Sequence, residues 1–136
     1  MFTFKTTVRM GDTDAAGIIY FANQFRIAHE GFEHFLDTIG LGVGHMLENT
    51  DYRFPIVHAE ADYKSPLKVG DSLTICMTVS RIGHSSISLL FRLFDRHDKE
   101  VGTVKIVHVA VDKATWKKRP LPQELKDVFE KVGPAR

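Results

Sequence analysis

Residues 23–39 read NQFRIAHEGFEHFLDTI, and this stretch decides the fold. Its apolar residues recur at the spacing of an α-helix, in a stripe made of Phe25, Ala28, Phe32, Phe35, Leu36 and Ile39. Asn23 suits the N-cap position, and Gly40 suits the stop. Because the stripe is almost wholly aromatic or aliphatic, we expect this helix to be buried against a large apolar surface.

Extended segments with alternating polar and apolar residues surround this helix. We expect strands at 2–10, 54–64, 72–82, 85–95 and 101–112. Shorter helices are expected at 44–49 and 122–132. The last three strands follow one another through hairpin-length turns, so their sheet is mostly antiparallel. The sequence therefore predicts an α+β fold in which one curved antiparallel sheet wraps around one long central helix.

The composition is that of a globular chain. The chain has 136 residues, of which 43% are hydrophobic and 26% charged, with a formal net charge of +1. This length fits a single domain spanning 1–136. The charge balance gives no reason to expect a nucleic acid or membrane partner, so an anionic ligand must meet a local basic patch. The single cysteine, the lack of a signal-like N-terminus and the lack of a membrane-spanning stretch favour a cytoplasmic protein.

The loop before the central helix holds the best candidate for chemistry. It reads Asp12-Thr13-Asp14-Ala15-Ala16-Gly17, followed at once by the apolar run Ile18-Ile19-Tyr20-Phe21. A carboxylate here lies near a helix N-terminus, so Asp14 is a candidate nucleophile or general base. The N–H groups near Phe21 are candidate donors to a developing oxyanion. Gly17 permits close approach of a substrate to the backbone.

Two alternatives apply to this loop. Paired aspartates are common in turns, where they bond to nearby N–H groups. A calcium-binding EF-hand loop would also need an oxygen ligand at position 16 and glutamate at 23, where the chain has alanine and asparagine. The calcium loop is therefore rejected, whereas turn chemistry stays open.

The histidines give weaker signals. His29-Glu30 begins like a zinc-protease helix, but Glu33 stands where the second histidine should be, so no metal is predicted. His29 and Glu30 are expected either to line a pocket or to satisfy each other in the core. His58 is either a substrate contact or a structural residue. His84, in the turn Gly83-His84-Ser85-Ser86, either completes a simple turn or holds a phosphate. The basic run 117–119 is either a solvated face or a contact for a phosphate-bearing ligand.

A family resemblance joins these observations. The motif Arg9-x-x-Asp12-Thr13-Asp14-Ala15-Ala16-Gly17-Ile18-Ile19-Tyr20-Phe21 resembles the 4-hydroxybenzoyl-CoA thioesterase family of the hotdog fold. The segment from Ala59 to Asp71 and the Gly83 turn agree with it in order. The resemblance implies hydrolysis of an acyl-CoA without metal or cofactor. Asp14 then corresponds to the catalytic carboxylate, the Phe21 N–H to the backbone donor, and Asp12 to a structural residue of the loop.

The resemblance also implies an assembly and a substrate. Active sites of the family lie at a homodimer interface, so the strand from His58 to Lys64 of one subunit would face Asp14 of the other, and dimers pair into homotetramers. Contacts to CoA are then expected from Lys64, Arg81, Gly83, His84, Ser85 and Ser86, with Lys68 as another candidate for phosphates. Contacts to the acyl group are expected from Gly17, Tyr20, His29, Phe54 and His58.

Two segments, Phe54 to His58 and Ala28 to Glu30, are most similar to the branch that hydrolyses 1,4-dihydroxy-2-naphthoyl-CoA in phylloquinone or menaquinone synthesis. Aromatic residues, Phe25 and Phe32 among them, would suit a bicyclic acyl group. A short-chain or broad aromatic acyl-CoA thioesterase is the alternative within the class. A non-catalytic acyl-CoA-binding hotdog module is the alternative outside it. A dehydratase is less favoured because the loop has no histidine beside Asp14.

Overall fold

The computed structural model describes residues 1–134. In chain order the elements are β1 (Phe2–Thr7), the 3-10 helix η1 (Met10–Asp12), α1 (Asn23–Thr38), α2 (Val43–Asn49), β2 (Tyr52–Arg53), β3 (Ile56–Tyr63), β4 (Ser72–Ile82), β5 (Ser86–Phe94), β6 (Glu100–Val109), β7 (Val111–Asp112) and α3 (Gln123–Val132). None of the helices within this range is both long and apolar enough to cross a bilayer.

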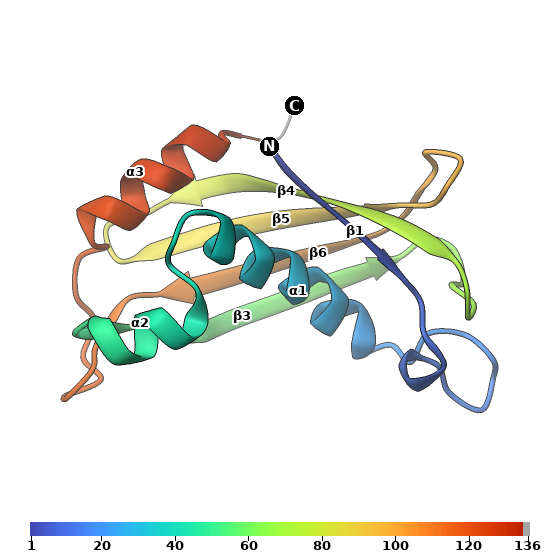
Figure 1. Cartoon of the computed structure of the whole chain (residues 1–136), viewed down its shortest axis with the longest axis horizontal. Helices are drawn as coiled ribbons and strands as arrows, with labels where there is room; N and C mark the ends of the chain where they lie inside the picture. Colours follow the sequence, from blue (N-terminus) through green and yellow to red (C-terminus); the bar gives the residue numbers. More distant parts are fainter. Residues whose placement is uncertain (135–136) are drawn as a thin grey trace.

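Five strands form one antiparallel sheet in the order β1-β4-β5-β6-β3. Figure 1 shows α1 lying along one face of this sheet. Alternate residues of β4 and β5 point into the core and are buried, as the alternation predicts: Leu73, Ile75, Met77, Val79, Ile87, Leu89, Phe91 and Leu93. Each such side chain stabilises the fold by about 1.5–3 kcal/mol relative to exposure. The predicted sheet around one long helix is confirmed.

The two ends of α1 differ in how well they were predicted. Gly40 follows the helix with φ of +76°, so the predicted stop is confirmed. The predicted N-cap is wrong, because the N-cap residue is Ala22 and Asn23 is already helical. The Asn23 side chain is instead used outside the helix, where its Nδ2 donates to the Asp12 carbonyl at 2.9 Å.

Two predicted strands are too long. The first ends at Thr7 rather than residue 10, because the Arg9 N–H donates to Asp12 Oδ2 at 2.8 Å and the chain turns into η1. The last breaks at Ala110, after which β7 pairs with β2 in a separate two-stranded sheet. The break matters for the site because it directs the chain after β6 toward the β4–β5 turn, where the Ala110 N–H donates to the Ser85 carbonyl at 2.8 Å.

Candidate active site

Figure 1 shows the loop between β1 and α1 at the end of the molecule opposite α2 and α3. Asp14 lies in an exposed tight turn of this loop. The turn is closed by the Gly17 N–H, which donates to the Asp14 carbonyl at 3.0 Å, and Gly17 has φ of +80°, a conformation that favours glycine. One carboxylate oxygen, Oδ1, accepts the Ala16 N–H at 2.8 Å. Within residues 1–134 the other oxygen, Oδ2, accepts no hydrogen bond, so it is free to act on a bound molecule.

Asp12 has a different environment, although it is only two residues away. It is 7% exposed, and its carboxylate accepts the Arg9 N–H and pairs with Arg26 of α1. Its carbonyl accepts the Tyr20 N–H at 2.8 Å as well as the Asn23 amide. Asp12 therefore ties the loop to the start of α1, which matches the structural position predicted for it.

Phe21 lies in the turn two residues before α1, with its side chain 60% exposed. Its carbonyl accepts the Tyr63 hydroxyl at 2.6 Å. In the part of the chain that the structure describes, its N–H donates to no acceptor, so it is available to a ligand oxygen at the positive end of the helix dipole.

The start of α1 is also fastened to the sheet by Gln24, which is 1% exposed. Its Nε2 donates to the Asp62 carbonyl at 3.0 Å and to the Thr103 carbonyl at 3.2 Å, so it bridges β3 and β6. Gly102 makes room for this amide, because a Cβ there would lie 2.7 Å from Nε2. Sequence reasoning missed Gln24, although a glutamine beside a helical apolar stripe was a visible signal.

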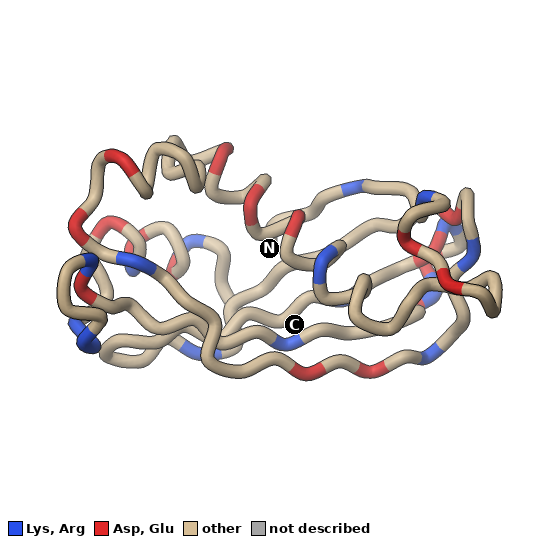
Figure 2. Tube along the Cα trace, turned by 90° about the horizontal axis from the view of Figure 1, so that it is seen from below, with Lys and Arg blue, Asp and Glu red and all other residues tan. Residues whose placement is uncertain are grey.

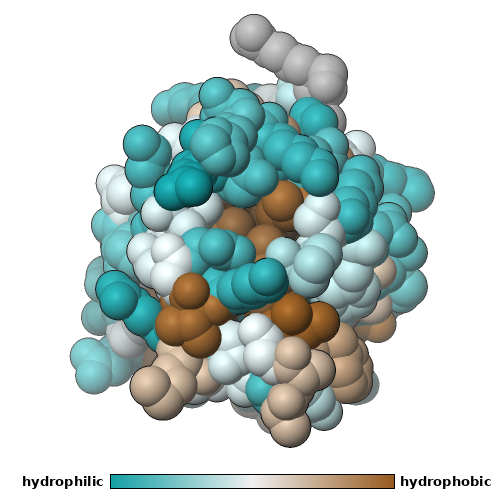
Figure 3. All heavy atoms as spheres, turned by 90° about the vertical axis from the view of Figure 1, so that its right-hand side faces the viewer, coloured by the Kyte–Doolittle hydropathy of each residue, from teal (hydrophilic) through white to brown (hydrophobic). Residues whose placement is uncertain are grey.

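Asp14 and Phe21 share one hollow of about 410 Å³. It is lined by Asp14, Ile18, Ile19, Phe21, Tyr63, Lys64, Ser65 and Pro66. Figure 3 looks onto this end of the molecule and shows apolar atoms at the surface among hydrophilic ones. The structure thus brings the predicted carboxylate and the predicted backbone donor together. Tyr63 and Lys64 reach this hollow from the same chain.

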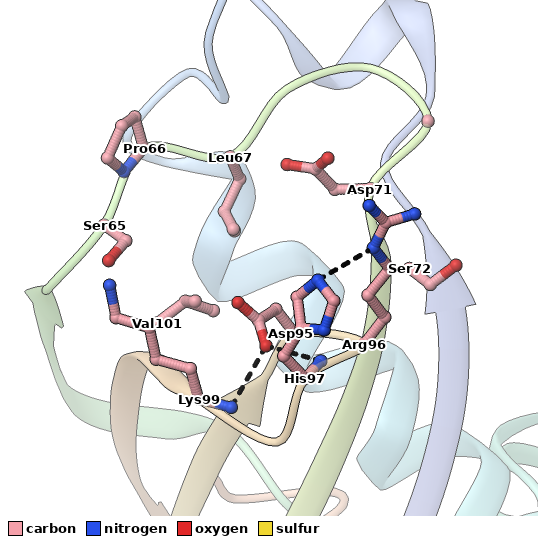
Figure 4. Close-up of a pocket in the computed structure, with 11 residues that line it drawn as sticks. Ser65, Pro66, Leu67, Asp71, Ser72, Asp95, Arg96, His97, Lys99 and Val101 are labelled. Carbon is pink, nitrogen blue, oxygen red and sulfur yellow. Dashed lines mark hydrogen bonds between the residues drawn. The ribbon is translucent and has the colours of Figure 1, made fainter.

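A second recess of about 350 Å³ borders the first, and Ser65 and Pro66 line both. Figure 4 shows the turn after β5 forming one wall, with the Asp95 carboxylate directed at backbone nitrogens of that turn. Asp95 Oδ1 accepts the N–H groups of His97 at 2.8 Å and Lys99 at 3.0 Å, which lower the pKa of Asp95. This acid therefore holds the turn rather than facing a substrate.

His29 and Phe54 meet at a different place, around His108 of β6. The ring of His108 lies 4.8 Å from that of Phe54, 5.4 Å from that of His29 and 4.7 Å from that of Phe32, measured between centroids. His108 was missed, although the alternation of β6 puts it on the inward face with Val104 and Ile106. The Nε2 atoms of both histidines are buried without a partner within residues 1–134.

Burial keeps His108 uncharged. Desolvation lowers its pKa to about 4, and the His29 ring adds to the shift. Its Nδ1 lies 2.8 Å from the Phe54 carbonyl, which can only accept, so Nδ1 carries the proton and Nε2 is left as an acceptor. Desolvation also lowers the pKa of His29. Both rings are therefore neutral at pH 7.

The predicted CoA contacts do not gather at Asp14 within one chain. Arg81, Gly83, His84, Ser85 and Ser86 lie at the β4–β5 turn, where Ser86 pairs with Val109 of β6. Tyr63 of the Asp14 hollow pairs with Gly102 of the same strand. The two points are seven positions apart along β6, which is about 23 Å of extended strand. Only Lys64 among these contacts reaches the hollow, and its Nζ pairs with Glu100 at 3.1 Å.

The other two predicted acyl contacts are exposed. Tyr20 is 44% exposed, and its ring lies 4.7 Å from that of Phe21. His58 lies on β3 opposite Val107, with its Nε2 3.9 Å from Glu60 Oε1. Residues 1–134 contain no group of three or more His, Cys, Asp or Glu side chains arranged to hold a metal ion.

Residues 8–129 match the thioesterase-like superfamily over nearly the whole chain. The chain belongs to this superfamily. The predicted hotdog fold is thereby confirmed, and so is the predicted thioesterase class.

Several proteins with known names are similar to the chain over most of its length. A 1,4-dihydroxy-2-naphthoyl-CoA hydrolase of Prochlorococcus marinus is 36% identical over 126 residues, covering 88% of this chain and 83% of that protein. One of Synechococcus elongatus is 34% identical over 127 residues, covering 93% of each. The crystal structure of a 1,4-dihydroxy-2-naphthoyl-CoA thioesterase from Synechocystis superposes with a TM-score of 0.90 at 26% identity, covering 96% of each chain.

Proposed function

We propose that this protein hydrolyses an acyl-CoA thioester, with 1,4-dihydroxy-2-naphthoyl-CoA as the substrate and the free acid and CoA as products. The observation that carries the proposal is the hollow shared by the Asp14 carboxylate and the free Phe21 N–H. A thioesterase needs both a base or nucleophile and a donor for the developing oxyanion, and these two groups supply them.

The proposed reaction uses only groups of this chain and water. The substrate carbonyl oxygen accepts the Phe21 N–H, whose position is fixed by the Tyr63 and Gln24 hydrogen bonds. Asp14 Oδ2 either removes a proton from a water that attacks the carbonyl carbon or attacks that carbon itself. The carbon–sulfur bond breaks, and the CoA thiolate leaves and takes up a proton. In the second route water then hydrolyses the resulting anhydride.

Two findings support an aromatic acyl group. Relatives that are 34–36% identical over most of the chain are named for the dihydroxynaphthoyl thioester. In addition, Phe32, Phe54, His29 and His108 form an aromatic cluster along α1. Of the predicted acyl contacts, His29 and Phe54 belong to this cluster, whereas Gly17 lies beside Asp14.

The proposed active unit is a homodimer formed through β3. This strand is one of the two edges of the sheet, and nearly all of its eight residues are exposed. Ile56 is 47% exposed and Val57 is 59% exposed. An unpaired edge strand with exposed apolar side chains promotes association with another strand. Pairing of two β3 strands would hide these side chains and continue the sheet.

Antiparallel pairing would also complete the site. The Tyr63 end of one β3 would lie beside the Ile56 end of its partner, so the partner's His58 would approach the Asp14 hollow. The partner's β4–β5 turn would move to the same side. This arrangement explains why the predicted CoA contacts Arg81 to Ser86 and Asp14 lie at opposite ends of one chain.

We further propose that residues 1–136 act as one domain, that the dimers pair into homotetramers, and that the protein works in the cytoplasm. Sedimentation velocity tests the assembly, with a tetramer expected at micromolar concentration. A monomer that hydrolyses acyl-CoA at full rate would contradict the shared active site.

The substrate proposal is tested by thiol release over a panel of acyl-CoAs. The panel contains 1,4-dihydroxy-2-naphthoyl-CoA, 4-hydroxybenzoyl-CoA, benzoyl-CoA and short aliphatic acyl-CoAs. The highest kcat/KM is expected for the dihydroxynaphthoyl thioester. Equal rates over the panel would indicate a broad thioesterase instead, and thermal stabilisation by acyl-CoA without any thiol release would indicate a binding module.

A single turnover in isotopically labelled water separates the two roles of Asp14. Label that enters the product acid directly indicates a general base. Label found first in the Asp14 carboxylate indicates a covalent anhydride.

A further inference from the structure

His108 of β6 is a buried polar side chain for which the proposed reaction has no role. It is 2% exposed and lies in the aromatic cluster with Phe32, Phe54 and His29. Its Nδ1 donates to the Phe54 carbonyl, so its Nε2 is an acceptor, and no group of residues 1–134 donates to it. Because a buried acceptor without a donor destabilises the fold, this atom points to a donor from a bound molecule.

His29 connects the aromatic cluster to the surface. Its side chain is 29% exposed, and its Nδ1 lies 3.9 Å from Glu33 Oε1. Its Nε2 is buried and, like that of His108, has no partner among the described residues. The cluster therefore holds two unpartnered ring nitrogens beneath a partly exposed ring. A hydroxyl group suits such nitrogens, because it can both donate and accept a hydrogen bond.

Three rings of the aromatic cluster are nearly parallel. The planes of Phe54 and His108 differ by 9°, and those of His108 and His29 differ by 21°. Flat aromatic walls favour a flat aromatic ligand, which gains stacking contacts that an aliphatic chain lacks. A few polar atoms between such walls are the usual means by which a pocket selects its ligand. The cluster thus fits a planar aromatic group that carries a hydroxyl.

The aromatic cluster and the Asp14 hollow lie at opposite ends of β3. His108 pairs with Ile56, where the strand begins, whereas Tyr63 of the hollow pairs with Gly102. His108 and Gly102 are six positions apart along β6, which is about 20 Å of extended strand. This distance exceeds the length of a bicyclic acyl group. An acyl group at the Asp14 hollow therefore does not reach His108 of the same chain.

The proposed dimer removes this separation. In antiparallel pairing, the Ile56 end of one β3 lies beside the Tyr63 end of the other, so the aromatic cluster of one subunit borders the Asp14 hollow of its partner. Figure 2 views the molecule from below, which is the side of β3 in Figure 1. Residues 56–59 include no Lys, Arg, Asp or Glu, whereas Glu60 and Asp62 follow in the other half of the strand. The uncharged half suits an aromatic acyl group.

We propose that His108 Nε2 of one subunit accepts a hydrogen bond from a ring hydroxyl of the acyl group bound at the Asp14 hollow of the other, an inference that rests on the proposed function. In the 1,4-dihydroxy-2-naphthoyl group, the 1-hydroxyl lies beside the thioester carbonyl and can bond to it internally. The 4-hydroxyl is the donor that is left for the protein. His108 is thus a specificity residue, which selects acyl groups that carry this hydroxyl over those that lack it.

A pair of substrates tests the proposal on the unaltered protein. 1-Hydroxy-2-naphthoyl-CoA differs from 1,4-dihydroxy-2-naphthoyl-CoA only in lacking the 4-hydroxyl. The kcat/KM of the wild-type protein should be about ten- to hundredfold higher for the dihydroxy substrate, because the other one leaves His108 Nε2 without a donor. A wild-type ratio near one would overturn the proposal, whatever the behaviour of any variant.

His108→Phe tests the residue itself. The substitution keeps an aromatic ring in the cluster but removes the acceptor, so the ratio of the two kcat/KM values should fall to near one through loss of activity on the dihydroxy substrate. A purely structural histidine would instead lower both activities and leave the ratio unchanged, which would overturn the proposal. His45→Phe, at an exposed histidine of α2, is the matched control and should keep the wild-type ratio.

Mixed dimers test which subunit supplies the histidine. Two differently tagged chains are co-expressed and purified as dimers through both tags. With Asp14→Asn on one chain and His108→Phe on the other, one site combines an intact Asp14 with the partner's intact His108, and the wild-type ratio should be kept. With both substitutions on one chain beside a wild-type chain, the remaining Asp14 faces the altered cluster, and the ratio should fall. The reverse pattern would overturn the assignment of the cluster to the partner's site.

The outcomes separate this proposal from the proposed function. If both naphthoyl thioesters are hydrolysed at equal rates, the role of His108 is wrong and the thioesterase stands. If the wild-type protein hydrolyses no acyl-CoA, the proposed function is wrong and the role of His108 falls with it.

Discussion

Asp12 and Asp14 show how two identical residues, two positions apart, acquire different roles. Asp12 is buried and accepts the Arg9 N–H while pairing with Arg26, so each of its carboxylate oxygens already has a partner within the protein. Asp14 is exposed and keeps one oxygen free of partners within residues 1–134. The family resemblance predicted a structural position for Asp12, and it made Asp14 the candidate for the catalytic carboxylate.

Asp12→Asn should therefore destabilise the fold. The substitution removes the negative charge beside Arg26. It also replaces one of the two oxygens that face the Arg9 N–H and Arg26 with an amide NH2, which cannot accept a hydrogen bond. We expect a loss of about 1–3 kcal/mol in the free energy of unfolding, measured by urea denaturation. Asp127→Asn, on the exposed surface of α3, should change stability by less than about 0.5 kcal/mol. Equal effects of the two variants would contradict the structural role of Asp12.

His108 should make stability depend on pH. Its pKa is about 4 in the fold, against an ordinary value of 6.5, so between these values only the unfolded chain binds the extra proton. The free energy of unfolding should fall as pH drops from 6.5 toward 4, by on the order of 3 kcal/mol in total. His108→Gln should remove this part of the pH dependence, whereas His97→Gln on an exposed turn should keep it. An unchanged slope in His108→Gln would contradict burial as the cause.

At the scale of elements, hydrogen bonds at the start of α1 hold the candidate site in place relative to the sheet. Tyr63 of β3 holds the Phe21 carbonyl, and Gln24 holds β3 and β6 to the helix. These bonds fix the N–H of Phe21 relative to Asp14. The helix and the hairpin-linked strands were predictable from periodicity, because their apolar residues all face one core. The early end of β1 was not predictable, because it depends on the hydrogen bond from Arg9 to Asp12.

Tyr63→Phe tests this fastening. Loss of the hydroxyl that donates to the Phe21 carbonyl should let the oxyanion donor shift and lower kcat by about tenfold, with KM nearly unchanged. Tyr52→Phe is the matched control, because its buried hydroxyl lies 3.3 Å from Glu124 and makes no contact with Phe21. Steady-state kinetics with one acyl-CoA measures both variants. A wild-type kcat in Tyr63→Phe would show that this hydrogen bond does not contribute to catalysis.

At the scale of the whole molecule, the predicted CoA contacts of the β4–β5 turn lie at one end of the described chain, and the Asp14 hollow lies at the other. Sequence motifs predicted the residues of both parts. The distance between the two parts along β6 was not predictable, because it depends on how the strands pair. His108 was likewise outside the predicted site, because a lone histidine in a strand has a common structural explanation. In the proposed homodimer, the exposed β3 edge would bring the two ends together through a second copy.

Val57→Lys tests that link. A charge on the exposed edge of β3 should oppose the pairing of two strands and shift the protein toward monomers in sedimentation equilibrium. Activity should fall together with the fraction of dimer, because each site would lose the partner's contacts. Val43→Lys, at a comparably exposed valine of α2, should leave assembly and activity unchanged. Monomers of Val57→Lys with full activity would show that one chain suffices.

The most direct test of the central proposal is the turnover of Asp14→Asn with 1,4-dihydroxy-2-naphthoyl-CoA. The amide keeps the shape of the side chain but can neither attack the thioester nor take a proton from water. We predict that kcat falls by at least about a hundredfold, while the melting temperature and the affinity for CoA stay at wild-type values. Thiol release by Asp14→Asn at the wild-type rate would contradict the assignment of the chemistry to this carboxylate.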